Sequence, residues 1–135
     1  MKVAIVYAST TGNTEALAKA AEEGAKAAGR NVLLTTADCA NEDEALAADL
    51  LLLGSPAMGA EQLEDSMETF FSGIESKISG KKIALFGSYD WGDGQWLRDW
   101  CDRAKNAGAD VPATLKAQLS PSAEDLEKAK KLGIL

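Results

Sequence analysis

Near its amino terminus the chain reads Val3-Ala4-Ile5-Val6-Tyr7-Ala8-Ser9-Thr10-Thr11-Gly12-Asn13-Thr14, and the rest of the sequence can be placed relative to this segment. Its first five residues are apolar and rich in β-branched side chains, which is typical of a buried strand. Strong helix formers follow from Glu15 to Ala21. Residues 8–14 lie between the two and hold four hydroxyls, one amide and one glycine. The segment therefore predicts a strand, a polar loop and a helix in succession.

The loop at residues 8–14 is suited to an anion. A helix start offers free backbone N–H groups and the positive end of the helix dipole, and Ser and Thr hydroxyls add donors. The loop contains no Lys or Arg, so that a phosphate would be held by neutral donors. It lacks the Gly-Lys-Ser/Thr ending of nucleotide triphosphatases and the three-glycine fingerprint of dinucleotide sites. A plain N-cap at Asn13 or Thr14 is the alternative, but a cap needs one such residue and the loop has five.

The composition is that of one globular domain, residues 1–135, with 46% hydrophobic and 26% charged residues. No apolar run approaches the roughly 20 residues that span a bilayer, so we expect no membrane association. Two distant cysteines, Cys39 and Cys101, fit no metal-binding spacing, and the chain has no histidine. We expect no metal site, and a cytoplasmic protein with free thiols.

The net charge of −7 is concentrated in two segments. Residues 55–68 contain four acidic and no basic residues, and residues 88–102 contain four acidic residues and one basic residue, Arg98. The acidic and basic residues elsewhere cancel. This charge argues against nucleic acid and anionic membranes as partners and favours proteins that present basic patches.

Strands and helices alternate along the remaining chain. Strands are predicted at residues 31–36, 49–54, 82–87 and within 110–119, and helices at residues 14–28, within 40–48, and at 62–78, 95–106 and 123–132. We expect Asn41 to cap the second helix and a capping box to start the last one. Five strands alternating with five helices imply a parallel sheet that is covered by helices on both faces.

Three unusual loops follow the first, third and fourth strands. In such sheets, ligands bind beyond the carboxyl ends of the strands, where the strand order reverses. Tyr89 and Trp91 lie in a glycine-flanked loop, where large aromatic side chains are poorly explained by core packing. A planar ligand between one of them and Met58 explains them better. Trp96 and Trp100, at helical spacing, are expected in the core instead.

A site for one phosphate beside a site for a planar ring describes flavin mononucleotide (FMN), and at this point the chain resembles a short-chain flavodoxin. The resemblance covers nearly the whole chain and rests on Ser9-Thr10-Thr11-Gly12-Asn13-Thr14, Ala57-Met58-Gly59-x-Glu61 and Gly87-Ser88-Tyr89-x-Trp91-Gly92-Asp93-Gly94. It implies an α/β fold: a flavodoxin-like, doubly wound, five-stranded parallel sheet of order 2-1-3-4-5, with helices on both faces.

The resemblance also implies how FMN is bound. The flavin ring lies between Met58 and Trp91, Glu61 accepts from the ring N3–H, and the backbone of residues 88–92 meets the pyrimidine oxygens. In the family, the carbonyl of the peptide corresponding to Gly59–Ala60 accepts from N5–H of the half-reduced flavin. The hydroxyl-rich loop, residues 8–14, binds the phosphate. The full set of expected cofactor-binding residues is Ser9, Thr10, Thr11, Gly12, Asn13, Thr14, Ser55, Pro56, Ala57, Met58, Gly59, Ala60, Glu61, Ser88, Tyr89, Asp90, Trp91 and Gly92.

The implied function is a low-potential one-electron carrier that cycles its FMN between semiquinone and hydroquinone, with no catalytic residues. We expect a monomer whose redox partner proteins dock through basic patches. The alternatives are an FMN-dependent NAD(P)H or quinone reductase and a flavodoxin-like module of a larger flavoprotein. A phosphate-responsive receiver is disfavoured because the first and third strands end in Ala8-Ser9 and Gly54-Ser55 rather than in aspartates.

Overall fold

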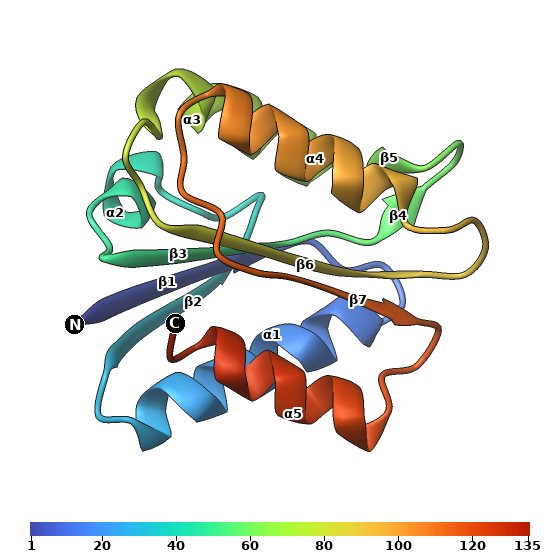
Figure 1. Ribbon diagram of the computed structural model, residues 1–135, viewed down its shortest axis with the longest axis horizontal. Helices are drawn as coiled ribbons and strands as arrows, with labels where there is room; N and C mark the ends of the chain where they lie inside the picture. Colours follow the sequence, from blue (N-terminus) through green and yellow to red (C-terminus); the bar gives the residue numbers. More distant parts are fainter.

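The computed structural model describes residues 1–135 (Figure 1). Its elements, in chain order, are β1 (Lys2–Tyr7), α1 (Asn13–Ala27), β2 (Asn31–Thr36), α2 (Glu42–Leu46), β3 (Leu50–Gly54), β4 (Ala57–Met58), β5 (Gln62–Leu63), α3 (Asp65–Ile74), a 3-10 turn (Glu75–Lys77), β6 (Ile83–Tyr89), α4 (Gln95–Asn106), β7 (Thr114–Gln118) and α5 (Ala123–Leu132). Five strands form a parallel sheet of order β2-β1-β3-β6-β7, and β4 and β5 form a separate antiparallel pair. Counted without the short pair, the order is the predicted 2-1-3-4-5.

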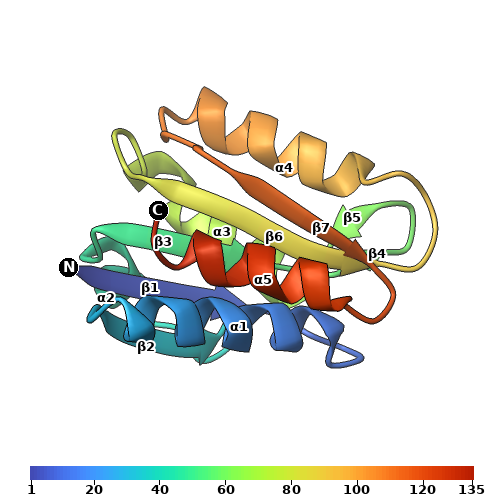
Figure 2. The same cartoon turned by 60° about the horizontal axis from the view of Figure 1, so that its bottom comes forward.

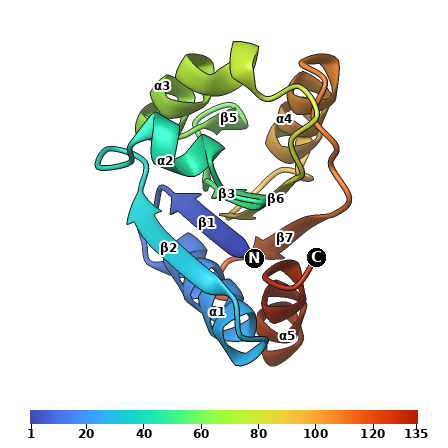
Figure 3. The same cartoon turned by 90° about the vertical axis from the view of Figure 1, so that its left-hand side faces the viewer.

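Alternate residues of the central strand face two separate cores. Leu51 and Leu53 of β3 pack with residues of α2, α3 and α4, whereas Leu50 and Leu52 pack with residues of α1 and α5. All four leucines are at most 1% exposed. Figure 3 shows the sheet between these two helical layers. A strand that is buried on both faces has to be apolar at every position, which is why this run predicts a central strand.

Helices α1 and α5 lie side by side on one face of the sheet, in front of the strands in Figure 2, and make a close contact through small residues. A Cβ atom at Gly24 of α1 would overlap the carbonyl oxygen of Lys130 in α5. A Cβ atom at Gly133 would overlap the carbonyl oxygen of Ala21 in the same way. The alanine-rich first helix thus packs closely on both the sheet and its neighbour. None of the helices is both long and apolar enough to cross a membrane.

Replacement of Gly24 tests this contact. We expect Gly24→Ala to lower the free energy of unfolding by about 1–3 kcal/mol, because its methyl group meets backbone that moves only if α5 moves. Gly73→Ala in α3 is the matched control, since its methyl group meets only the flexible Glu42 carboxylate. Alanine also favours a helix over glycine by about 0.5–1 kcal/mol. Urea unfolding of both variants makes the comparison, and equal midpoints would contradict the predicted overlap.

Arg103 ties α3 to α4 on the other face. It donates to both carboxylate oxygens of Glu68, at 2.8 and 3.0 Å, and to both of Glu75, at 3.0 and 3.3 Å. Its guanidinium carbon also lies 4.9 Å from the centre of the Phe71 ring. The hydrogen bonds to Glu68 and Glu75 raise the pKa of Arg103, and the bond from Arg103 lowers the pKa of Glu68 below its ordinary 4.5. The bridge fixes the spacing of the two helices that flank β5.

The Arg103 bridge makes stability depend on pH. Because the folded pKa of Glu68 lies below its unfolded value, the bridge contributes fully above pH 4.5 and its contribution is lost as the pH falls through the folded pKa. We expect Arg103→Met to lower the free energy of unfolding by roughly 1–2 kcal/mol at neutral pH, allowing for half-exposed carboxylates. Arg98→Met, which removes an exposed arginine of the same helix, is the control. Urea unfolding from pH 7 downward measures both, and a loss for Arg103→Met that stays constant with pH would refute the assignment.

Three predicted elements have boundaries that differ in the structure. The helix predicted at residues 62–78 begins at Asp65, because Gln62 and Leu63 pair with Met58 and Ala57 as β5, and it ends at Ile74, where the 3-10 turn Glu75–Lys77 follows. The strand predicted at 82–87 continues to Tyr89, because its last residues pair with β7. The third difference concerns the start of α1 and is described with the site. The remaining elements lie where they were predicted, including the Asn41 cap of α2 and the α5 capping box, which Ser122 and Asp125 form.

Candidate functional site

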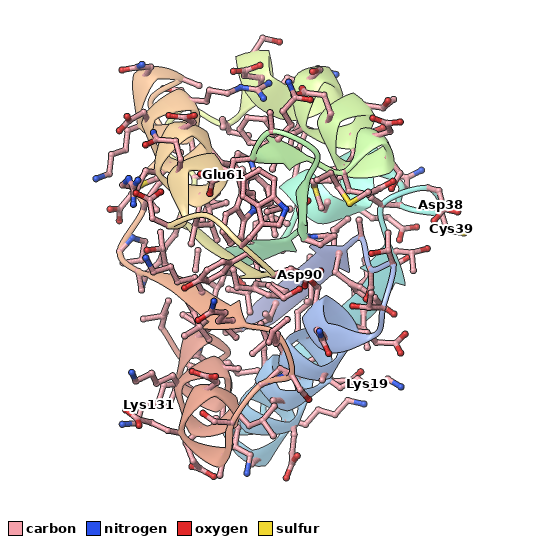
Figure 4. All side chains as sticks on the ribbon, turned by 90° about the vertical axis from the view of Figure 1, so that its right-hand side faces the viewer. Lys19, Asp38, Cys39, Glu61, Asp90 and Lys131 are labelled. Atoms are coloured by element: carbon pink, nitrogen blue, oxygen red, sulfur yellow. The ribbon has the colours of Figure 1, made fainter.

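Three loops meet at the carboxyl end of the sheet, where β1, β3 and β6 are adjacent. Figure 4 looks onto this end: Glu61, from the turn between β4 and β5, and Asp90, from the loop after β6, both lie near the centre. The start of α1 comes to the same end after β1. The three unusual loops of the sequence are therefore neighbours in space, as predicted from the strand order.

The start of α1 is open. The N-cap is Gly12, at φ +91°, rather than the predicted Asn13 or Thr14, and no side chain of the cap residue bonds to the helix. Only the Ser9 hydroxyl reaches the turn, accepting from the N–H groups of Gly12 at 3.1 Å and Glu15 at 3.3 Å. The N–H groups of Asn13 and Thr14 donate to no protein acceptor. Because the chain leaves these donors free at the positive end of a helix, the loop is ready to receive an anion.

The one acid of this first turn is held by its neighbours. Glu15 accepts a hydrogen bond from the Tyr7 hydroxyl at 2.9 Å, and its other carboxylate oxygen lies 3.7 Å from Lys19 Nζ. Burial and this bond to Glu15 raise the pKa of Tyr7, so the phenol stays protonated and keeps donating. The Tyr7 hydroxyl and Lys19 thus partly compensate the charge of Glu15, while the loop itself contains no cationic group.

The second loop folds into a small hairpin. Ala57 and Met58 pair with Leu63 and Gln62 across a three-residue turn, residues 59–61. Its base is fixed by Ser55, whose hydroxyl donates to the Pro56 carbonyl and accepts from Glu64 N–H, while the Ser55 carbonyl accepts from the indole of Trp96. The sequence predicted a loop here rather than a pair of strands. A short segment with glycine between two small strands is a hairpin signal, but strands of two residues are too short for a period to show.

Glu61 links this hairpin to α4. Its Oε1 accepts from the backbone N–H of Gly94 at 3.1 Å and of Gln95 at 2.8 Å. Gly94 is the N-cap of α4 and has no side chain to cap it, so a residue more than thirty positions earlier does so. Glu61 adopts φ +53°, a conformation that a non-glycine residue takes only when its contacts hold it there. From the sequence, Glu61 was predicted to bind a ligand through its carboxylate. Its role as the cap of α4 was not predicted.

Met58 and Trp91 line the same cavity. It has a volume of about 170 Å³ and is bounded by both of them together with Ala57, Gly59, Glu61 and Asp90. Trp91 is 65% exposed and Met58 39% exposed, whereas Trp96 and Trp100 are 2% and 1% exposed in the core, as predicted. Two large apolar side chains left open on opposite loops have no partner within the chain, and a flat ligand between them would cover both.

The residues expected to bind the cofactor differ in their exposure to solvent. Those open to solvent are Thr10, Thr11, Gly12, Met58, Gly59, Ala60, Asp90, Trp91 and Gly92. Partly buried ones are Ser9, Asn13, Ala57, Glu61 and Tyr89, and the buried ones are Thr14, Ser55, Pro56 and Ser88. Tyr89 packs against Trp96, with ring centres 5.5 Å apart, so Trp91 rather than Tyr89 is the aromatic residue available to a ring.

The protein-family model of flavodoxin matches residues 5–133. The chain belongs to the flavodoxin family. The flavodoxin of Megasphaera elsdenii is 45% identical over 132 residues, which cover 97% of this chain and 95% of that protein. The flavodoxin of Clostridium beijerinckii is 49% identical over 111 residues, which cover 82% of this chain and 80% of that protein. In structure, two-electron reduced Megasphaera elsdenii flavodoxin matches with a TM-score of 0.89 at 43% identity, over 98% of this chain and 99% of that one.

As a flavodoxin, the chain is an FMN-containing electron carrier rather than an enzyme. The site fits this cofactor on its own geometry. The free N–H groups at the start of α1 suit a phosphate, and the cavity between Met58 and Trp91 suits a planar ring. Both features lie at the same end of the sheet, beyond adjacent strands, where a single elongated molecule can reach them.

Substitution of Glu61 measures its capping role without any cofactor. We expect Glu61→Ala to lower the free energy of unfolding of the FMN-free protein by about 1 kcal/mol, because the N–H groups of Gly94 and Gln95 lose their acceptor. Glu61→Gln keeps an acceptor oxygen and loses only the charge, so its loss should be smaller, about 0.3–0.5 kcal/mol. Urea unfolding at low salt ranks the variants, and identical losses for Ala and Gln would refute the cap.

Proposed function

We propose that the three loops bind one FMN, with its phosphate at the start of α1 and its flavin ring between Met58 and Trp91. The open start of α1 carries this proposal, because a helix terminus without a cap leaves donors that only a ligand or water can satisfy. The roles expected at Ser9, Thr10, Thr11 and Asn13 follow from their place on this loop.

Near the proposed position of the flavin ring, Glu61 has one carboxylate oxygen that is free to accept a hydrogen bond from it. Oε1 is held by the N–H groups at the start of α4, and Oε2 makes no hydrogen bond within the chain. We assign Oε2 to the flavin N3–H. Because Oε1 is fixed, Oε2 is oriented before the ligand arrives, which lowers the entropy cost of that contact.

The Gly59–Ala60 peptide forms the tip of the hairpin and is the element that can respond to the state of the cofactor. Gly59 has φ +52°, and nothing lies within 4 Å of the position where a Cβ would be. A peptide next to such a residue can turn at low cost, since glycine accepts either sign of φ. We assign its carbonyl the role of accepting a hydrogen bond from N5–H when the flavin carries a proton there.

Bound FMN supplies one-electron transfer at low potential, and the chain contributes negative charge around it. Asp90 lines the cavity and makes no ion pair, and Asp93 next to it pairs only with the exposed Arg98. At about 15 Å and an effective dielectric constant near 20, one carboxylate destabilises an added electron by roughly 1 kcal/mol before salt screening. This corresponds to about 40 mV for a one-electron couple.

The same charge suits a transient complex with an electron donor or acceptor. The net charge of −7 is concentrated in residues 55–68 and 88–102, and these segments form the hairpin, the start of α3, the loop after β6 and most of α4. We propose that redox partner proteins dock here through basic patches, with rates that fall as salt rises. We further propose a monomer in a reducing cytoplasm, in line with the two free cysteines, Cys39 and Cys101.

Reconstitution with FMN followed by a potentiometric titration tests the function. We expect FMN-free protein to take up one FMN and to show two separate one-electron potentials. Asp90→Asn should raise the lower potential by about 20–40 mV at low salt, because one unpaired carboxylate beside the ring is lost.

Asp110→Asn is the control for charge alone. Asp110 is exposed, and its backbone pairs with that of Lys82 just before β6, at the opposite end of the strand from Asp90. A seven-residue strand is more than 20 Å long, so the same loss of charge there should change the lower potential less than Asp90→Asn does, and by less than about 10 mV once the ionic strength is raised to about 0.15 M, where the Debye length is about 8 Å. Protein that takes up no FMN, or equal shifts in the two variants, would refute the proposal.

A further inference from the structure

Two buried hydroxyls connect the start of α1 to the end of β6. Thr14 is the second residue of α1 and Ser88 the last but one of β6, and their side-chain oxygens lie 2.7 Å apart. Thr14 is 1% exposed and Ser88 4% exposed. The contact joins the loop assigned to the phosphate with the strand that leads into the loop assigned to the ring.

This pair holds one hydrogen more than the chain can accept. Two hydroxyls carry two hydrogens, one of which lies in the bond between them, and neither oxygen makes a further hydrogen bond. Ser55, the third buried polar side chain, shows the contrast: its hydroxyl both donates, to the Pro56 carbonyl, and accepts, from Glu64 N–H. Each hydroxyl of the pair therefore has one partner, and the remaining hydrogen is free for an acceptor that a ligand brings.

The groups around Thr14 and Ser88 indicate which of the two hydroxyls carries the hydrogen that is not used in the bond between them. Thr14 belongs to the first turn of α1, where its own N–H and that of Asn13 are also without acceptors. Three donors at one place share a single anion more readily than each finds a separate acceptor. Ser88 lies within β6, where it pairs with Ala117 of β7 and is not part of the first turn of α1.

We infer that Ser88 is a positioning residue for the phosphate: its hydroxyl donates to Thr14 Oγ1, and this directs the Thr14 hydroxyl hydrogen to a phosphate oxygen. The inference rests on the proposed FMN site and adds a role to Ser88, which the resemblance placed near the ring only through its backbone. A chain of two hydroxyls then orients one donor for the far end of the cofactor. Without Ser88, the Thr14 hydroxyl loses the bond that sets its direction.

Binding of two flavins separates this role from a structural one. FMN-free protein is titrated with FMN and with riboflavin, which has the same ring but no phosphate, and quenching of flavin fluorescence gives both affinities. We expect Ser88→Ala to weaken FMN about tenfold and riboflavin less than threefold. The ratio of the two affinities is the readout, because a general loosening of the fold lowers both together.

A double-mutant cycle with Thr14→Val tests whether Ser88 acts on phosphate binding through the Thr14 hydroxyl. Valine has the shape of threonine without its hydroxyl, so Thr14→Val should lower the ratio by itself, and Ser88→Ala should lower it no further in that background. Urea unfolding of each variant shows that the flavins were offered to folded protein. Independent, multiplying effects of the two substitutions on the ratio, or an unchanged ratio in Ser88→Ala, would overturn the inference and leave the FMN site standing. Wild-type protein that binds neither flavin would overturn both.

Discussion

β3 pairs in parallel with β1 on one side and with β6 on the other. The chain therefore leaves all three strands at the same end of the sheet, the carboxyl end. Residues 8–14, 55–61 and 90–94 are far apart in the sequence and become neighbours only through these ladders. The strands have no freedom to slip, since a shift of one residue would exchange Leu51 and Leu53 with Leu50 and Leu52 between the two cores. The ends of these three strands are therefore held in fixed positions relative to one another.

A chain with a net charge of −7 has to bind a phosphate without help from a cation in the binding loop. The geometry meets this need with neutral donors: open N–H groups at the start of α1, and hydroxyls around them. The one carboxylate of that turn, Glu15, is held by Tyr7 and Lys19. In the proposed site, negative charge lies on the ring side, where Asp90 lines the cavity and, having no ion pair, would make an added electron less stable. Anchoring of the cofactor and tuning of its potential are thus assigned to separate loops.

Contacts that cross between loops give the site its order before any ligand binds. Glu61 joins the hairpin to the start of α4, and Thr14 joins the start of α1 to the end of β6. The hairpin tip itself is free of such contacts at Gly59. A movable peptide set in an otherwise fixed frame is what a carrier needs, because electron transfer is fast only when little else rearranges.

The sequence by itself determined the sheet, its two helical layers and the three loops that form the candidate site. Apolar runs such as Leu50–Leu53 indicate strands that are buried on both faces, and an exposed Trp91 between glycines indicates a ligand, because these patterns depend on local backbone preference and on burial. Only the tertiary structure decided that Gly12 rather than Asn13 or Thr14 begins α1, that Gln62 is in a strand, and that Glu61 caps a distant helix. Contacts such as the Glu61 cap and the Thr14–Ser88 bond join residues 34 and 74 positions apart, and they depend on register and side-chain direction, which are set only when the layers pack together.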